Sequence, residues 1–294
     1  MVCTTAMNNI IEDRYTEKEM MRVHSHVVSC LTLHENKLYT GSTDKNIRIW
    51  NTETHAEIAT LRGHTDYVWC LTIHENKLYS GGYDKTIRIW NTETHEEIAI
   101  LRGHTGKVYS LALHKNKLYS GSADNTIRVW NADTYEEITA LIGHTDYVSC
   151  LTHFKNKLVS GSFDNTIRIW NIETYEEIAT LRGHTSYLRC LTLHENKLYS
   201  GSEDNTIRIW NTETYEEIAT LRGHTSYLRC LTLHENKLVS GSGDKTIRIW
   251  NTETHEEIAI LRGHTNGVIY LNLTLHENKL FSGSYDNTIR IWNI

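Results

Sequence analysis

The chain repeats a unit of 40 residues seven times, and this repetition constrains the fold more than any other feature. Residues 181–220 and 221–260 differ at only five positions. Tryptophan stands at one fixed position of each unit, from Trp50 to Trp250 at intervals of 40, and again at Trp292 after a two-residue insertion. A period of this length indicates a repeat architecture rather than two independent domains.

Each unit has the pattern of four short β-strands separated by turns. In the fifth unit we expect strands near 187–193, 197–202, 206–211 and 215–221, with polar turns such as HENK between them. No segment without a turn is long enough for an amphipathic helix of 11–18 residues. Four strands per unit, repeated seven times, favour radial repetition. The sequence therefore predicts an all-β fold: one domain over 1–294, a seven-bladed β-propeller with four antiparallel strands per blade.

The recurring motifs also resemble a known family. Gly-His near the start of the unit, SGSxD in its middle and TIRIW at its end are similar to the WD40 repeat. The chain departs from that family by having Trp-Asn instead of Trp-Asp in all seven units, and Val23-His24 instead of Gly-His in the first. The resemblance implies a propeller that binds peptides or protein partners around its central channel.

The resemblance further implies a structural tetrad of hydrogen-bonded side chains in every unit. A buried indole N–H needs an acceptor, a hydroxyl can pass the interaction to an imidazole, and a carboxylate fixes the tautomer of that imidazole. The expected tetrads are His24, Thr40, Asp44 and Trp50; His64, Ser80, Asp84 and Trp90; His104, Ser120, Asp124 and Trp130; His144, Ser160, Asp164 and Trp170; His184, Ser200, Asp204 and Trp210; His224, Ser240, Asp244 and Trp250; and His264, Ser282, Asp286 and Trp292.

A serine, a histidine and an aspartate in each unit also suggest a hydrolase. An enzyme needs one pre-organised site, whereas the same three residues repeated in seven units indicate a structural role. Tetrads take seven of the 18 histidines and the HENK-type turns take six more, which leaves little for a metal site. We expect no enzymatic activity, no cofactor and no metal.

Composition narrows the class of partner. A net charge of −6 and a pI near 6.3 argue against nucleic-acid binding, and no apolar run is long enough to cross a membrane. The N-terminus has no apolar core typical of a secretory signal. Five of the six cysteines share one repeat position and fall on different sheets, so we expect free thiols in the cytoplasm or the nucleus. The sequence leaves the oligomeric state open, with a monomer favoured.

The last unit ends after its third strand. Aligning His24 with His64 places residues 13–22 where a fourth strand belongs, so we expect this segment to complete the last blade and close the ring. Residues 1–12 are expected to be a disordered tail. Deleting residues 1–22 should then lower the melting temperature.

The two faces of the expected disc differ in how much the units vary. The turns HENK and NTET recur almost unchanged, and we call their side the constant face. The turns between second and third strands, with the connectors between units, form the variable face. Its candidate partner-binding residues are Tyr67, Trp69, Tyr83, Lys107, Tyr109, Tyr147, Phe163, Tyr187, Arg189, Glu203, Tyr227, Arg229 and Tyr285.

Tyrosine, tryptophan and arginine are enriched at interface hot spots, which favours a non-catalytic scaffold that binds partners on the variable face. Three alternatives stay open. Arg189 and Arg229 would hold a phosphorylated or acidic peptide, unless Glu203 or another carboxylate neutralises them. Drift at tolerant loop tips would also diversify this face. Finally, the near-identity of the units and the absence of proline fit a recently amplified or engineered repeat protein with no evolved ligand.

Overall fold

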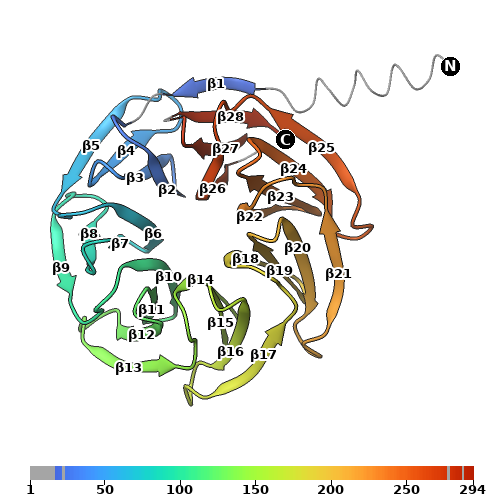
Figure 1. Ribbon diagram of the computed structural model, residues 1–294. Coiled ribbons are helices and arrows are strands. Elements are labelled where there is room, and N and C mark those ends of the chain that lie inside the picture. The colour runs from blue at the N-terminus through green and yellow to red at the C-terminus, as the bar shows by residue number, and fades with distance from the viewer. Residues whose placement is uncertain (1–16, 22–23, 277–278, 287) are drawn as a thin grey trace.

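The computed structural model describes residues 17–21, 24–276, 279–286 and 288–294, with backbone only for 17–21 and 269–276. Every strand lies in a four-stranded antiparallel sheet, and the sheets stand around a common axis as blades (Figure 1). The strands of blades 1 to 3 are β2 (Val28–His34), β3 (Lys37–Ser42), β4 (Asn46–Asn51), β5 (Glu57–Arg62), β6 (Val68–His74), β7 (Lys77–Gly82), β8 (Ile87–Asn91), β9 (Glu97–Leu101), β10 (Val108–His114), β11 (Lys117–Ser122), β12 (Thr126–Asn131) and β13 (Glu137–Ile142).

The remaining blades follow the same order. Their strands are β14 (Val148–Phe154), β15 (Lys157–Ser162), β16 (Thr166–Asn171), β17 (Glu177–Arg182), β18 (Leu188–His194), β19 (Lys197–Ser202), β20 (Thr206–Asn211), β21 (Glu217–Arg222), β22 (Leu228–His234), β23 (Lys237–Ser242), β24 (Thr246–Asn251), β25 (Glu257–Arg262), β26 (Val268–His276), β27 (Lys279–Ser284), β28 (Ile289–Asn293) and β1 (Glu17–Met21). The first strand of each unit lies nearest the axis and the fourth lies at the rim (Figure 1).

The expectation of seven copies of one blade needs a correction at the seam of the ring. Six sheets consist of four consecutive strands each, whereas the seventh takes only β26, β27 and β28 from the C-terminal end. Its rim strand is β1, which covers five residues of the expected 13–22 and bulges between Glu17 and Glu19. The register of β26 is also broken, between Val268 and Leu273, at the insertion. The ring therefore has six blades of one kind and a composite, irregular seventh.

The parts of the N-terminal segment expected at 1–12, 13–16 and 22 lie outside the described residues. Where β1 is described, it pairs antiparallel with β28, with Met21 opposite Ile289. The first and last described strands, β1 and β28, thus lie side by side (Figure 1).

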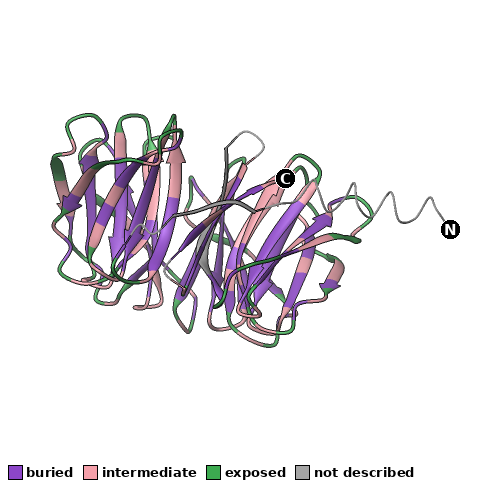
Figure 2. Ribbon diagram, turned by 90° about the horizontal axis from the view of Figure 1, so that it is seen from above, coloured by how far each residue is buried: buried purple, intermediate pink, exposed green. Residues whose placement is uncertain are grey.

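The hydrophobic core lies between blades, so each blade depends on its neighbours. In the cluster shared by blades 4 and 5, Ile167 and Ile169 pack with Leu198 and Trp210, all nearly inaccessible to solvent. Burying one such side chain contributes about 1.5–3 kcal/mol. Figure 2 shows the result: buried residues follow the strands, and exposed residues gather in the turns at the two ends of the disc. The turns are therefore free to carry function.

Small residues allow the inner strands to approach one another. A Cβ added at Gly201 would lie 2.6 Å from Cys190 Sγ and 3.1 Å from Leu228 Cβ, so no larger residue fits there. The five described cysteines are free and buried, which agrees with the expectation of free thiols. Burial raises the pKa of Cys30 to about 12. In the described part of the chain, no helix is long and apolar enough to span a membrane.

Candidate functional site

The structure brings the four residues of each expected tetrad together in one hydrogen-bonded chain. In blade 5, Trp210 Nε1 donates to Ser200 Oγ at 2.8 Å, and Ser200 Oγ lies 2.8 Å from His184 Nε2. His184 Nδ1 lies 2.7 Å from Asp204 Oδ2. Because a carboxylate only accepts, Nδ1 carries the proton and Nε2 accepts from the serine. The other six tetrads repeat these contacts within 2.7–3.0 Å.

The tetrad aspartates are held in their charged form. Burial alone raises the pKa of Asp44, but hydrogen bonds from His24 and Asn46 and the attraction of His24 outweigh it and lower the pKa to about 2. In the other six tetrads the same balance, with Thr in the place of Asn46, lowers the aspartate pKa further. The carboxylates are thus fixed acceptors at neutral pH.

These tetrads cannot act as catalytic triads. The hydroxyl that would attack a substrate, Ser200 Oγ, is completely buried and occupied by Trp210 and His184. A nucleophile must reach the substrate, so the seven sets serve structure. The described residues also contain no group of three or more His, Cys, Asp or Glu side chains placed to hold a metal ion.

What the tetrads do is fix the loops of the variable face. Asp204 Oδ2 accepts from the amide of Thr185 in the connector, and Asp204 Oδ1 accepts from Thr206 at the start of β20. Next to it, the Glu203 amide donates to the Tyr187 carbonyl at 2.9 Å. A bond of this kind joins two variable positions in all seven blades: Thr43 to Val27, Tyr83 to Tyr67, Ala123 to Lys107, Phe163 to Tyr147, Glu203 to Tyr187, Gly243 to Tyr227 and Tyr285 to Gly267.

An arc of aromatic rings crosses blades 2 to 5 on this face. Trp69 stacks on Tyr83, with ring centroids 4.9 Å apart, and meets the edge of Tyr109 at 5.8 Å. Tyr109 in turn lies 5.9 Å from Tyr147 and 6.1 Å from Phe163.

The ends of the arc carry the remaining aromatic contacts. Phe163 stacks almost parallel on Tyr187 at 4.5 Å, Tyr67 lies 5.3 Å from Tyr83, and the Lys107 ammonium sits 4.0 Å above the Tyr83 ring. The tyrosines at the connector position remain about 40% exposed, so the arc presents apolar surface to solvent. Four blades thus contribute to one continuous surface, as an extended ligand would require.

The arc ends in a charged cluster on blades 5 and 6. The Arg189 guanidinium lies over Phe163, 4.1 Å from the ring centroid, and its Nε donates to Glu203 at 2.8 Å, with a second, shorter bond from Nη2. Arg229 Nη1 lies 3.7 Å from the same carboxylate and its guanidinium covers Tyr227. Burial, then repulsion from Arg189, lowers the pKa of Arg229.

Glu203 therefore takes the place between the two arginines that an acidic or phosphorylated ligand would need. All three side chains are less than a fifth exposed, so the two positive charges are already largely compensated within the protein. The sequence had left open whether Glu203 neutralises Arg189 and Arg229, and in the structure it does so. The guanidinium groups of Arg189 and Arg229 still stack on aromatic rings, and they form part of the surface of the variable face.

A cavity of about 310 Å³ opens beside this cluster, between blades 6 and 7. Tyr227, Arg229 and Tyr285 line it, together with Gly243 and Gly267. At the positions of the last two, the other units carry larger side chains, among them Tyr147, Phe163 and Glu203, and the cavity lies beside these two glycines. Reasoning from sequence does not select these glycines as site residues. Their small size among large counterparts was the available signal.

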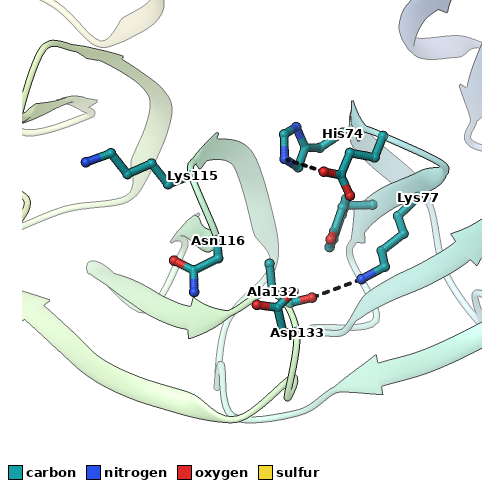
Figure 3. Close-up of a pocket in the computed structure, with 8 residues that line it drawn as sticks. His74, Lys77, Lys115, Asn116, Ala132 and Asp133 are labelled. Carbon is teal, nitrogen blue, oxygen red and sulfur yellow. Dashed lines mark hydrogen bonds and ion pairs between the residues drawn. The ribbon is translucent and has the colours of Figure 1, made fainter.

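The constant face has its own cavity, of about 360 Å³, between blades 2 and 3 (Figure 3). Lys77 crosses it to the Ala132 carbonyl at 3.4 Å, and His74 Nε2 lies 3.9 Å from Glu75 Oε1. Lys115 is directed away from His74 (Figure 3). Most of these lining residues recur in other units, so this cavity reflects the repeat more than a dedicated site.

All thirteen residues selected on the variable face lie in one region of the molecule. Trp69, Tyr109, Phe163, Arg189, Glu203 and Arg229 form an unbroken chain of contacts, and the other seven adjoin it through ring contacts or the cavity. The structure therefore establishes their proximity. Their role in binding is a separate question.

Comparisons with known proteins agree with this architecture. A comparison with curated protein sequences gives no match. Among solved structures, the chain is similar to the crystal structure of the computationally designed Ika8 protein, with 28% identity, a TM-score of 0.75, and coverage of 92% of this chain and 97% of that one. The family model described as "WD domain, G-beta repeat" matches residues 17–51, 56–91, 95–131, 135–171, 175–211, 215–251 and 255–293. Seven matches over nearly the whole chain show that it belongs to the WD40 repeat family.

Proposed function

We propose that the protein is a non-catalytic scaffold that binds partner proteins or peptides on its variable face. The observation that carries this is the unbroken surface from Trp69 to Arg229, built from residue types enriched at interface hot spots. The constant face is exposed as well, yet its turns repeat almost unchanged.

The shape of the face favours an extended peptide with apolar side chains. The tyrosines at positions 67, 147, 187 and 227 are each 39–42% exposed and offer flat rings from different blades. The cavity beside Arg229 is large enough for one anchoring side chain. Because Glu203 already pairs with both arginines, we expect a neutral or weakly charged ligand to bind better than a highly acidic one.

Panning a random peptide library on the intact chain tests the proposal. Selected peptides are then titrated against a variant in which Tyr67, Tyr147, Tyr187 and Tyr227 are all changed to alanine. We expect at least a ~30-fold loss of affinity, because a single hot-spot residue is worth about 2 kcal/mol or more.

The matched control changes four exposed glutamates of the constant face to alanine, at Glu53, Glu93, Glu173 and Glu213. This variant should bind the selected peptides as the intact chain does. Equal binding by the tyrosine variant would contradict the proposal, and so would loss of binding in the glutamate variant.

A second candidate is a repeat protein with no evolved ligand. The near-identity of the units favours it, as does the similarity to a designed protein. It predicts that panning enriches no peptide that distinguishes the two faces. Under either candidate, the buried free thiols fit a reducing compartment such as the cytoplasm, and measuring the chain's location with a fluorescent tag tests this.

A further inference from the structure

Inner strands of adjacent blades lie side by side with a constant offset of 39 residues. Ser149 Oγ on β14 donates to the Leu188 carbonyl on β18 at 2.6 Å, and Ser29 Oγ on β2 donates to the Val68 carbonyl on β6. The same offset relates His114, the last residue of β10, to His153 on β14. Their imidazole rings are 4.9 Å apart between centroids, with an interplanar angle of 67°. Two histidines from different blades thus meet at the constant-face end of the inner strands.

This meeting of two imidazoles occurs at one blade pair only among the regular units. At the position of His153 the other regular units carry an apolar residue, namely Leu33, Ile73, Leu113, Leu193 and Leu233. The fourth unit reads His-Phe where most others read Leu-His. Phe154 takes an apolar role, packing against the core shared by blades 4 and 5, and His153 is left facing His114. The change from Leu-His to His153-Phe154 in one unit has therefore produced a histidine pair that the other regular units lack.

The geometry of the pair suits one shared ion. Two imidazoles bound to one zinc-like ion at a metal–nitrogen distance of about 2.0 Å have their centroids roughly 5 Å apart when the bond angle is near tetrahedral. The observed separation is 4.9 Å. His114 Nε2 is also buried without a hydrogen-bond partner among the described residues. A buried nitrogen lone pair or N–H without a partner is costly, and a ligand would relieve that cost.

Burial disfavours the protonated form of both rings, and a metal binds only the neutral imidazole. Burial, followed by the charges of Lys115 and Lys117, lowers the pKa of His114. Burial and then His114 lower the pKa of His153. Lys117 is held by the Tyr175 hydroxyl at 2.6 Å and the Ile172 carbonyl at 3.3 Å, so its ammonium is fixed between blades.

Lys115 works against a cation, and this supplies a way to test the site. It stands where most other units carry glutamate, including Glu75 and Glu195. Repulsion from its ammonium should weaken metal binding without removing either ligand.

We propose that His114 and His153 bind one divalent transition-metal ion of the zinc, nickel and copper class, with water completing the coordination sphere. Imidazole is the ligand type that these ions share, whereas magnesium prefers oxygen. The site lies on the constant face, so it is independent of the proposed partner-binding surface.

Calorimetric titration of the full chain with Ni²⁺ near pH 7.5 tests the proposal, with Mg²⁺ as the negative control. We expect one equivalent of Ni²⁺ to bind more tightly than the background from exposed histidines. His153→Leu, which restores the residue of the other units, should weaken this binding at least ~10-fold, because one of two protein ligands is lost. His153→Gln should do the same while keeping a polar side chain. Thermal melts of each variant without metal establish that it folds.

Two further variants should strengthen binding. Lys115→Glu should tighten Ni²⁺ binding several-fold by replacing repulsion with attraction. Leu233→His should place a second imidazole beside His194, next to Glu195, and raise the stoichiometry from one to two. Absence of Ni²⁺ binding by the unmodified chain, or equal binding by His153→Leu, would overturn the proposal.

Discussion

The variable and constant faces of the disc are built by the same repeat, yet they use their turns differently. On the variable face, buried carboxylates such as Asp204 accept from the connector, from β20 and from His184. On the constant face, half-buried amides such as Asn211 accept from the backbone of their own turn, at Glu213 and Thr214. The variable face, whose turns are hydrogen-bonded to buried carboxylates, is the face on which the side chains differ between units.

The difference teaches how a repeat separates stability from recognition. The tetrad and the backbone bond between Glu203 and Tyr187 fix the main chain, so its course does not depend on the side chains at these two positions. The HENK turns also have a backbone bond, from the Thr212 amide to the Asn196 carbonyl at 2.9 Å in blade 5, and their sequence is nearly uniform. What the variable face adds is the buried carboxylate of the tetrad. Support from buried groups therefore permits variation at the surface above them.

Acid should produce the largest effect and act through the variable face. The pKa of Asp44 is lowered from 3.8 to about 2 in the folded protein, and the pKa of each of the other six tetrad aspartates is lowered further. A lowered folded pKa means that the stabilisation is present above pH ~4 and is lost as pH falls through the folded values. We expect the free energy of unfolding, measured by urea titration, to fall steeply between pH 4 and 2.

The acid prediction has an internal control. Asp204→Asn removes one titrating carboxylate, so the pH dependence of unfolding should become shallower in this variant. A free energy of unfolding that stays constant from pH 5 to 2.5 would contradict the assignment of stability to the tetrads.

Removing one hydrogen-bond acceptor from each face compares how much the turns of the two faces contribute to the free energy of unfolding. Asp204→Ala should cost about 2–4 kcal/mol, because it leaves the buried His184 N–H and two amides without their acceptor. Asn211→Ala should cost about 1 kcal/mol, because the amides it leaves are in an exposed turn. Urea unfolding at pH 7 measures both values, and equal costs would remove the distinction between the faces.

The smallest expected effect concerns backbone conformation in a turn of the variable face. Lys85 has a φ of 66°, in the left-handed region, and the equivalent Asn125, Asn165 and Asn205 have φ values of 67–69°. Asparagine tolerates this conformation better than lysine. Lys85→Asn should therefore raise the free energy of unfolding by a few tenths of a kcal/mol, up to about 1.

A matched substitution shows whether that gain depends on the conformation. Asn205→Lys in blade 5 should lower stability by a similar amount. Differential scanning calorimetry resolves the two shifts in melting temperature. Shifts of the same sign would show that another contact, and not φ, determines the preference.

Much of the fold can be predicted from the sequence because equivalent residues recur at a fixed spacing, which aligns the units with one another. The spacing of tryptophans such as Trp210 and Trp250 fixes the blades, and each tetrad follows from fixed offsets within one unit. The seam is harder to predict, since β1 pairs with a strand from the other end of the chain and the insertion breaks the register of β26.

Contacts between units were less accessible from the sequence. Glu203 lies in the same blade as Arg189, yet its contact with Arg229 of the next blade depends on how the side chains turn. The pairing of His114 with His153 depends on the 39-residue offset between inner strands, which only the geometry of neighbouring sheets reveals. Patterns within one unit carry no information about such offsets.

The backbone bond that joins two variable positions in each blade has a consequence for how such a protein changes over time. Seven bonds fix fourteen neighbouring positions whose main-chain geometry is independent of the residues they carry. The residue at each of these positions can be replaced separately, without moving the main chain of its unit. A change of specificity then needs only local replacements that leave the main chain in place, so recognition can diverge while the ring stays the same.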